Sequence, residues 1–137
     1  MIAKNRIKII KLTNIFFKNI KVNYAENILS NLNSCPITFI NELGFKKSYY
    51  KEDLVSKTSR LANYFRSIGV KKGDRIAAVS VNSAETLIAF LAVNSIGAIW
   101  SSCSPDFGEV AILDRFNQIK PKAVSYTHLT LPTILLV

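Results

Sequence analysis

A strand, a helix and a second strand follow one another between Arg75 and Ser101, and this unit limits the fold more than any other part of the chain. Residues 75–81, RIAAVSV, have the apolar and β-branched character of a mostly buried strand. Ala84–Ser95 is apolar on nearly all sides, as expected for a helix buried between a sheet and another layer. Gly97 ends this helix, and Ala98–Ser101 supplies the second strand. Because such crossovers are almost always right-handed, we expect two parallel strands in a sheet of the α/β class.

Further elements precede this unit. Residues 37–41 and 46–50, ITFIN and KKSYY, are strand-forming runs on either side of a turn, which predicts an antiparallel pair. A helix is expected from Lys51 to Ile68, because apolar residues, Val55 among them, recur there at spacings of three and four. For the helix inside the strand–helix–strand unit, we expect Asn82 as the N-cap and Glu85 three positions later as its partner.

The loop Ser101–Gly108, SSCSPDFG, leaves the carboxyl end of the second strand. Ligands of open α/β sheets bind at that edge, so this loop is the place where a substrate or cofactor could pass. Pro105, Asp106 and Gly108 are also ordinary turn residues between a strand and a helix. On these residues alone, the ordinary turn is the favoured interpretation.

The net charge of +9 is concentrated at the start of the chain. Six of the 18 basic residues and none of the nine acidic ones fall within residues 1–25, which leaves a net charge of +3 for the rest. With no aromatic stacking platform in this segment, we expect no nucleic-acid partner. Residues 1–22 could form a basic amphipathic helix on a membrane. Lys8 and Lys11 interrupt any signal-peptide core, and we favour docking of this segment onto the domain over membrane contact.

The residues that perform chemistry in enzymes are sparse. Cys35 and Cys103 stand far apart, without metal or redox spacing, and indicate two reduced thiols of a cytoplasmic protein. We interpret Cys103 as a small residue that packs a turn rather than as a nucleophile. The five glycines are scattered, so no phosphate-binding loop is present. We therefore expect neither a catalytic residue nor a metal site among these residues.

Blocks of residues in the same order throughout the chain resemble one known family. These blocks are NYAENIL at Asn23–Leu29, GVKKGDRIA at Gly69–Ala77, the helix positions Asn82, Glu85 and Ile88–Ala92, GAIWSSCSPDFG at Gly97–Gly108, and LDRFNQIKPK at Leu113–Lys122. Together they resemble the acetoacetyl-CoA synthetases, a family of AMP-forming acyl-CoA ligases, over residues 16–124.

This resemblance implies a parent enzyme that uses ATP, Mg²⁺ and CoA to convert acetoacetate, through an acyl-adenylate, into acetoacetyl-CoA, AMP and diphosphate. With 137 residues, the chain would be an incomplete N-terminal part of the large ligase domain, inactive alone and without tight cofactor binding. The resemblance also implies that Arg115 lies near the nucleotide end of CoA, with Ser104 and Asp106 on the same side. An ion pair of Arg115 with Asp114 or another acid is an equally good interpretation. Trp100 is expected in the core.

Three segments are expected on this basis: a basic segment, 1–36, docked on the domain; a partial α/β ligase subdomain, 37–124; and a tail, 125–137. The tail, SYTHLTLPTILLV, does not resemble the family but resembles translated sequencing-adapter read-through, so we expect it to be non-native. Taken as protein, Tyr126–Leu131 would form one short strand, and we give His128 no role. The alternative to the ligase hypothesis is a small stand-alone α/β module that binds a nucleotide or CoA without catalysis.

Overall fold

The computed structural model describes residues 21–32, 36–128 and 131–136. Cys35, residues 1–20 and the final valine lie outside this range, so the predictions for the basic segment are addressed only from residue 21 onward. Within the described part of the chain, no helix is long and apolar enough to cross a membrane.

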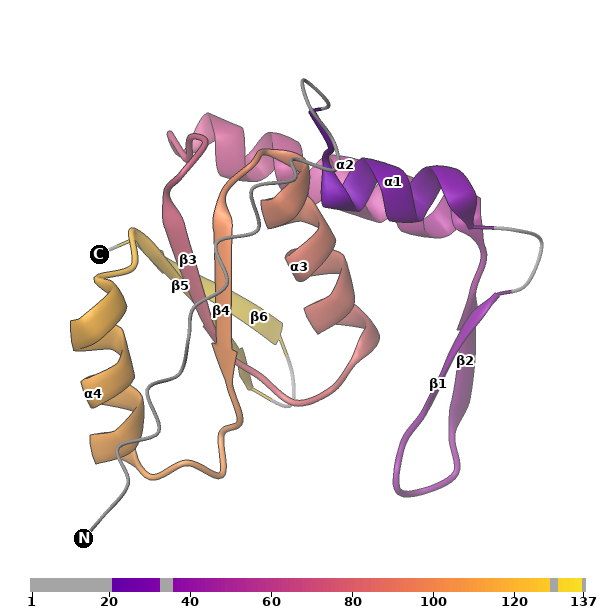
Figure 1. The fold of residues 1–137 in the computed structure, drawn as a ribbon. Helices are drawn as coiled ribbons and strands as arrows, with labels where there is room; N and C mark the ends of the chain where they lie inside the picture. Colours follow the sequence, from indigo (N-terminus) through magenta and orange to yellow (C-terminus); the bar gives the residue numbers. More distant parts are fainter. Residues whose placement is uncertain (1–20, 33–35, 129–130, 137) are drawn as a thin grey trace, which may run out of the picture.

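A four-stranded sheet forms the centre of the molecule, in the order β4-β3-β5-β6. Strand β3 (Arg75–Val79) runs parallel to β4 (Ile99–Cys103) on one side and to β5 (Ala123–His128) on the other. The predicted parallel strand–helix–strand unit is therefore confirmed. The chain moves outward from β3 to β4 and back across β3 to β5. The crossover helices α3 (Ala84–Ser95) and α4 (Glu109–Ile119) lie on opposite faces of the sheet (Figure 1), as two crossovers of the same hand require.

Both strands of this unit have bounds that differ from the prediction. β3 ends at Val79 rather than at Val81, and Val81 is 55% exposed because the chain turns there into α3. β4 continues to Cys103 rather than ending at Ser101, since the pairing of Val79 with Cys103 extends the ladder. The loop at the sheet edge is consequently shorter and begins at Ser104.

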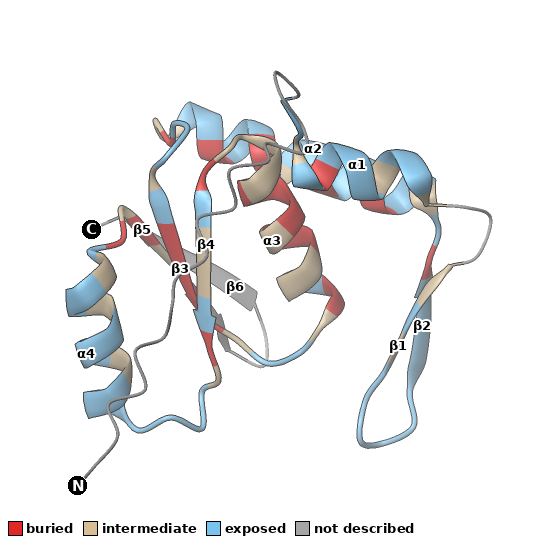
Figure 2. Cartoon of the chain, viewed as in Figure 1, coloured by how far each residue is buried: buried red, intermediate tan, exposed pale blue. Residues whose placement is uncertain are grey.

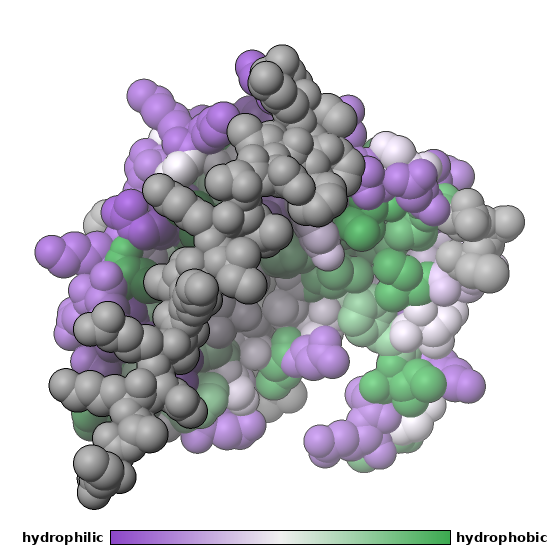
Figure 3. Space-filling view, viewed as in Figure 1, coloured by the Kyte–Doolittle hydropathy of each residue, from purple (hydrophilic) through white to green (hydrophobic). Residues whose placement is uncertain are grey.

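The strand–turn–strand prediction is confirmed by β1 (Ile37–Ile40) and β2 (Lys46–Tyr49), which pair antiparallel. This hairpin projects away from the central sheet (Figure 1). Tyr49 is buried in a small cluster with Leu54, Ala84 and Ile88, and this cluster holds the base of the hairpin against the two helices that follow. On the face seen in Figure 3, hydrophobic side chains gather where the hairpin meets these helices.

The long helix α2 (Lys51–Ser67) follows the hairpin as predicted. Its buried residues are Leu54, Thr58, Ala62 and Phe65, spaced by four, four and three, which is the period of one helix face. Val55, which the pattern placed on the same face, is instead 38% exposed, because it lies at the border of the stripe. Gly69 follows the helix with a φ of 84°, a left-handed conformation that suits glycine at a helix end.

The N-cap of α3 is Ser83, and the prediction of Asn82 was wrong by one residue. The Ser83 hydroxyl accepts a hydrogen bond from the Thr86 N–H at 3.3 Å, which satisfies one of the free N–H groups of the first turn. Glu85 is therefore the second helical residue rather than the third. Burial of α3 on more than one side is confirmed by Ala84, Ile88, Ala89, Leu91, Ala92 and Val93.

Helix α1 (Tyr24–Asn31) packs against α3. Asn23 caps α1 by accepting from the Glu26 N–H at 3.2 Å, and its own amide donates to the Ser95 carbonyl at 3.0 Å. One side chain thus joins the start of α1 to the end of α3. The rings of Tyr24 and Phe90 meet edge to face, with centroids 5.6 Å apart.

The main core lies between β3 and the helices α2 and α3, where buried residues concentrate in Figure 2. It is formed by Ala62, Phe65, Val70, Ile76, Ala92, Val93, Ala98 and Ala123. Trp100 is partly buried and packs against this cluster, as expected for a core residue, and its ring lies edge to face with Phe90 at 6.4 Å.

The end of the chain forms two strands, so the prediction of one strand at Tyr126–Leu131 was wrong. Residues up to His128 belong to β5, whose pairing with β3 begins at Ile76 and Ala123. The chain then returns as β6 (Leu131–Leu136), antiparallel to β5. A local pattern could not place these bounds, because they follow from pairing with a strand more than 40 residues earlier.

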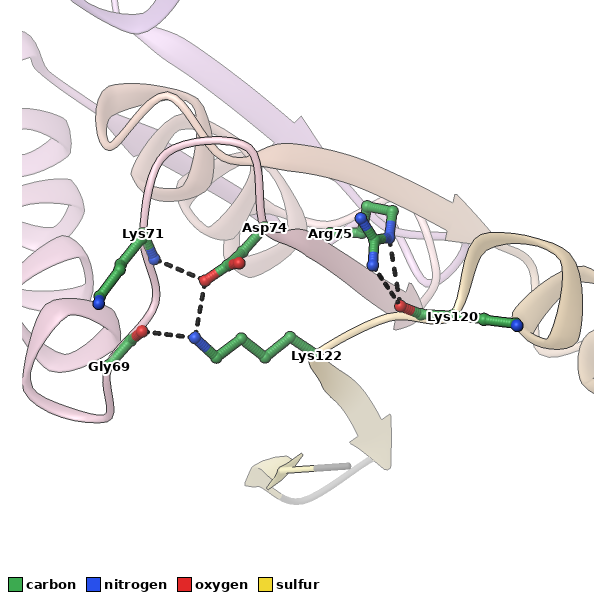
Figure 4. Close-up of polar contacts among 6 residues, drawn as sticks. All are labelled: Gly69, Lys71, Asp74, Arg75, Lys120 and Lys122. Carbon is green, nitrogen blue, oxygen red and sulfur yellow. Dashed lines mark hydrogen bonds and ion pairs between the residues drawn. The ribbon is translucent and has the colours of Figure 1, made fainter.

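Polar contacts join the amino ends of β3 and β5 (Figure 4). The Lys122 ammonium donates to the Gly69 carbonyl at 2.6 Å and forms an ion pair with Asp74 at 2.8 Å. The Arg75 guanidinium donates to the Lys120 carbonyl at 3.2 Å, beside the end of α4. These contacts join the start of β3 and the turn before it to the segment between α4 and β5, at the edge of the sheet opposite to the loop after β4.

Candidate functional site

The candidate site is the loop of residues 104–108, which joins β4 to α4 at the carboxyl ends of β3 and β4. Ser104 and Asp106 lie together there. The Ser104 hydroxyl donates to the Asp106 carboxylate at 2.8 Å and accepts from the Asp106 N–H at 3.3 Å. The Phe107 N–H donates to the Ser104 carbonyl at 3.2 Å. Both predicted residues thus use their polar groups to order the loop.

Arg115 lies on α4, and its exposed guanidinium stacks on the same loop. The guanidinium carbon is 4.7 Å from the centroid of the Phe107 ring, a cation–π contact. The alternative ion pair with Asp114 is not formed, and the Asp114 carboxylate instead accepts from the Gln118 amide at 3.2 Å. Among the described residues, Arg115 has no acidic partner within ion-pair distance.

Phe107 is the member of this group that sequence reasoning missed. It is 42% exposed, and it sits in a loop, outside any helical or strand period that would mark it as core. The available signal was an aromatic residue of the loop eight positions before an arginine of the next helix. Such a spacing brings two side chains together only in a particular local geometry, here that of a loop residue just before the N-cap Gly108 and an arginine on the helix that follows.

Cys103 ends β4 beneath this loop. It is 6% exposed, and its sulfur lies 3.6 Å from the Ala78 carbonyl. Burial raises the pKa of the Cys103 thiol above its ordinary value, and the nearby positive charge of Arg115 opposes this effect only in part. A neutral, buried thiol is a poor nucleophile and fits the packing role expected from the sequence.

The described residues do not fit the phosphates of ATP or a magnesium ion. No three or more histidine, cysteine or acidic side chains gather in the described ranges in a way that could hold a metal. The glycines occupy separate turns, and the Gly73 N–H is used by the Gly97 carbonyl at 3.0 Å. By contrast, the exposed Arg115 guanidinium is of a kind that binds phosphate or stacks on a planar ring.

Residues 38–134 match the sequence profile of the family described as AMP-binding enzyme. Because this match covers well over half of the 137 residues, the chain belongs to the AMP-binding enzyme family. The match extends ten residues past Val124, where the motif-based resemblance ended.

Particular members of this family confirm the resemblance to acetoacetyl-CoA synthetases. The chain is 44% identical to the acetoacetyl-coenzyme A synthetase of Rhizobium meliloti (strain 1021) over 110 residues, which cover 78% of this chain and 17% of the relative. It is 42% identical to the acetoacetyl-CoA synthetase of Macaca fascicularis over 112 residues, 80% of this chain and 17% of that protein.

The fold agrees with these relatives. The structure of the acetoacetyl-CoA synthetase from Streptomyces lividans superposes with a TM-score of 0.71 at 28% identity, over 81% of this chain and 18% of that one. The α/β chain therefore has the architecture of part of an adenylate-forming ligase. It spans about one sixth of the length of the curated relatives it matches.

Proposed function

We propose that this chain is the N-terminal part of an acetoacetate–CoA ligase. The complete enzyme would join acetoacetate to CoA at the expense of ATP, through an acyl-adenylate, and release AMP and diphosphate. The observation that carries the proposal is the 44% identity to the Rhizobium meliloti acetoacetyl-coenzyme A synthetase over 110 residues. The partners would be these small molecules, with neither nucleic acid nor membrane, in the cytoplasm.

In this proposal, the chain's own contribution is to bind CoA. Arg115 would contact a phosphate or the purine at the nucleotide end of CoA, because its guanidinium is exposed and already oriented by Phe107. Ser104 and Asp106 would act on the same side by holding the loop that carries Phe107. CoA supplies the thiol that accepts the acyl group.

ATP and Mg²⁺ would be held by residues beyond this chain, because the described residues lack a phosphate-binding loop and a cluster of metal ligands. No chemical step is therefore assigned to this chain. Alone, we expect it to be inactive and to bind none of the cofactors tightly.

A chimera tests the ligase proposal. Residues 21–124 would replace the matching segment of the Rhizobium meliloti acetoacetyl-coenzyme A synthetase, and AMP release would be measured with acetoacetate and CoA. We expect AMP release that requires both substrates. A chimera that has the same unfolding temperature as the parent enzyme, and is therefore folded, but releases no AMP would contradict the proposal.

The same chain tests the alternative of a stand-alone module. Calorimetric titration of the 137-residue chain with CoA should show no affinity in the micromolar range. Micromolar binding without the rest of the enzyme would favour the module instead.

The proposal keeps the three segments 1–36, 37–124 and 125–137, with the last as a non-native tail. The family match extends to residue 134, ten residues beyond the boundary at Val124. Long-read sequencing of the source DNA across the codon for Val124 decides whether residues 125–137 are native or a non-native tail. Family-like sequence after that codon would support the boundary, and an unchanged SYTHLTLPTILLV would contradict it.

A further inference from the structure

A cavity of about 360 Å³ lies between helices α2 and α3 and the face of the sheet that they cover. It exists because the residues that face it from β3, α3 and β5 are small, namely Ala78, Ala89 and Ser125. Its volume is in the range of small-molecule sites. Since α4 covers the other face of the sheet, this cavity is separate from the loop that carries Ser104 and Arg115.

The cavity has an aromatic wall. Tyr64 and Phe65 of α2 and Trp100 of β4 line it, and Phe65 is fully buried. The edge-to-face contact of Trp100 with Phe90 holds the indole in place. Such a wall suits the apolar body of a ligand, and aromatic faces also attract cations.

The opposite end of the cavity is polar. The Ser80 hydroxyl is buried and has no hydrogen-bond partner among the described residues, a state that a bound donor or acceptor would relieve. The Thr86 hydroxyl, in contrast, already donates to the Val81 carbonyl at 2.8 Å. Among the described residues that line the cavity, Glu85 is the charged one, and its side chain is exposed and within electrostatic range of Lys47. Ser80 directly follows β3 and Glu85 lies in the first turn of α3, so both polar groups belong to the same end.

We propose that this cavity binds a small primary amine with an apolar body. The ammonium group would face Glu85 and Ser80, and the body would lie among Phe65, Tyr64 and Trp100. A carboxylate acts as an acceptor only and carries the charge opposite to an ammonium, so Glu85 selects amines over acids. An anion such as acetoacetate is thus disfavoured as an occupant, and the inference does not rest on the proposed ligase function.

Trp100 makes the proposal measurable, because it is the only tryptophan of the chain. Its fluorescence would be followed during titration of the 137-residue chain with 2-phenylethylamine and, as a matched acid, 3-phenylpropionate. We expect a saturable change with the amine at a concentration at least tenfold lower than with the acid. The absence of a saturable amine signal, or equal binding of the acid, would overturn the proposal.

Two variants assign the binding to the cavity. Ala89→Phe fills it and should abolish the signal, whereas the same substitution at the exposed Ala111 of α4 should leave it unchanged. Glu85→Gln removes the charge without filling the space and should abolish the preference for the amine. Circular dichroism verifies that each variant is folded. If Ala89→Phe does not fold, unchanged amine preference in Glu85→Gln is sufficient to refute the proposal.

Discussion

The Lys122 ammonium lies 2.8 Å from the Asp74 carboxylate, and this pair joins the start of β5 to the turn before β3. The same carboxylate oxygen accepts the Lys71 N–H at 2.7 Å. The two charged residues are 48 positions apart, so the pair does not form within a single turn. It links the turn that precedes β3 to the end of the second crossover, after α4, and favours the observed placement of β5 beside β3.

We expect this pair to make stability depend on pH. The hydrogen bond from Lys122, and then that from the Lys71 N–H, lower the pKa of Asp74 below its ordinary value of 3.8. A carboxyl group whose pKa is lowered by folding stabilises the native state above its unfolded pKa, and this contribution disappears as the pH falls through the folded pKa. In urea unfolding, the chain should therefore exceed Asp74→Asn in stability at about pH 7, and the difference should shrink from about pH 4 downward.

Glu42→Gln is the control for this measurement, because Glu42 is an exposed carboxylate of the hairpin turn. Glu42→Gln should leave the free energy of unfolding unchanged both at about pH 7 and below about pH 4. A difference between the chain and Asp74→Asn that stays constant down to pH 2 would contradict the assigned role.

Substitution of leucine by alanine at a buried and at an exposed position tests the packing of the core. Leu54 is fully buried, whereas Leu43 at the hairpin turn is 92% exposed. Leu54→Ala should lower the free energy of unfolding by about 2–5 kcal/mol, because it removes buried methyl groups and leaves a cavity. Leu43→Ala makes the same chemical change and should stay within about 0.5 kcal/mol of the parent. Equal effects of the two substitutions in chemical denaturation would show that the hairpin and α2 are not packed as described.

Local patterns predicted the elements of this fold better than their ends. The apolar period was sufficient to predict helix α2. The order of β3, α3 and β4 along the chain was sufficient to predict parallel strands. The apolar and β-branched character continues to Val81, however, and only the turn into α3 ends the strand at Val79. The pairing of β5 with β3 depends on residues far apart in sequence, which no local period records.

The candidate site was predictable to a similar extent. Strand order placed the loop after β4 at the carboxyl edge of the sheet, and the motif resemblance selected Arg115. Neither indicated Phe107, because the cation–π contact depends on how the loop approaches the first turns of α4, which no local period records. The Ser104–Asp106 contact was also not expected, although serine and aspartate two positions apart commonly order turns.

Capping of α3 offers a test between neighbouring residues. The structure assigns the cap to Ser83, whose hydroxyl accepts the Thr86 N–H, whereas the sequence pattern had favoured Asn82. Ser83→Ala should lower the free energy of unfolding by about 1 kcal/mol, through the loss of this hydrogen bond. Asn82→Ala should have a much smaller effect, since Asn82 is exposed and precedes the cap. If thermal unfolding showed a larger loss of stability for Asn82→Ala than for Ser83→Ala, Asn82 rather than Ser83 would be the N-cap.

Arg115 should determine the affinity for CoA in the chimeric ligase. Removal of a charge-assisted hydrogen bond to a phosphate in Arg115→Ala should raise the KM for CoA roughly tenfold or more. The KM for acetoacetate should not change, because Arg115 contacts only the CoA side in this proposal. Phe107→Leu should raise the KM for CoA by a smaller factor. Phe107→Tyr should keep the KM of the unsubstituted chimera, since an aromatic face is what orients the guanidinium.

Arg60→Ala is the matched control for Arg115→Ala, because it removes an exposed arginine from α2 at a distance from the loop. Steady-state AMP release at varied CoA, at low and moderate salt, distinguishes the two variants. A specific contact predicts a CoA effect for Arg115→Ala alone. If both substitutions raised the KM for CoA equally, and moderate salt abolished the effect, general attraction of CoA by positive charge would explain the result, and the assigned contact would be wrong.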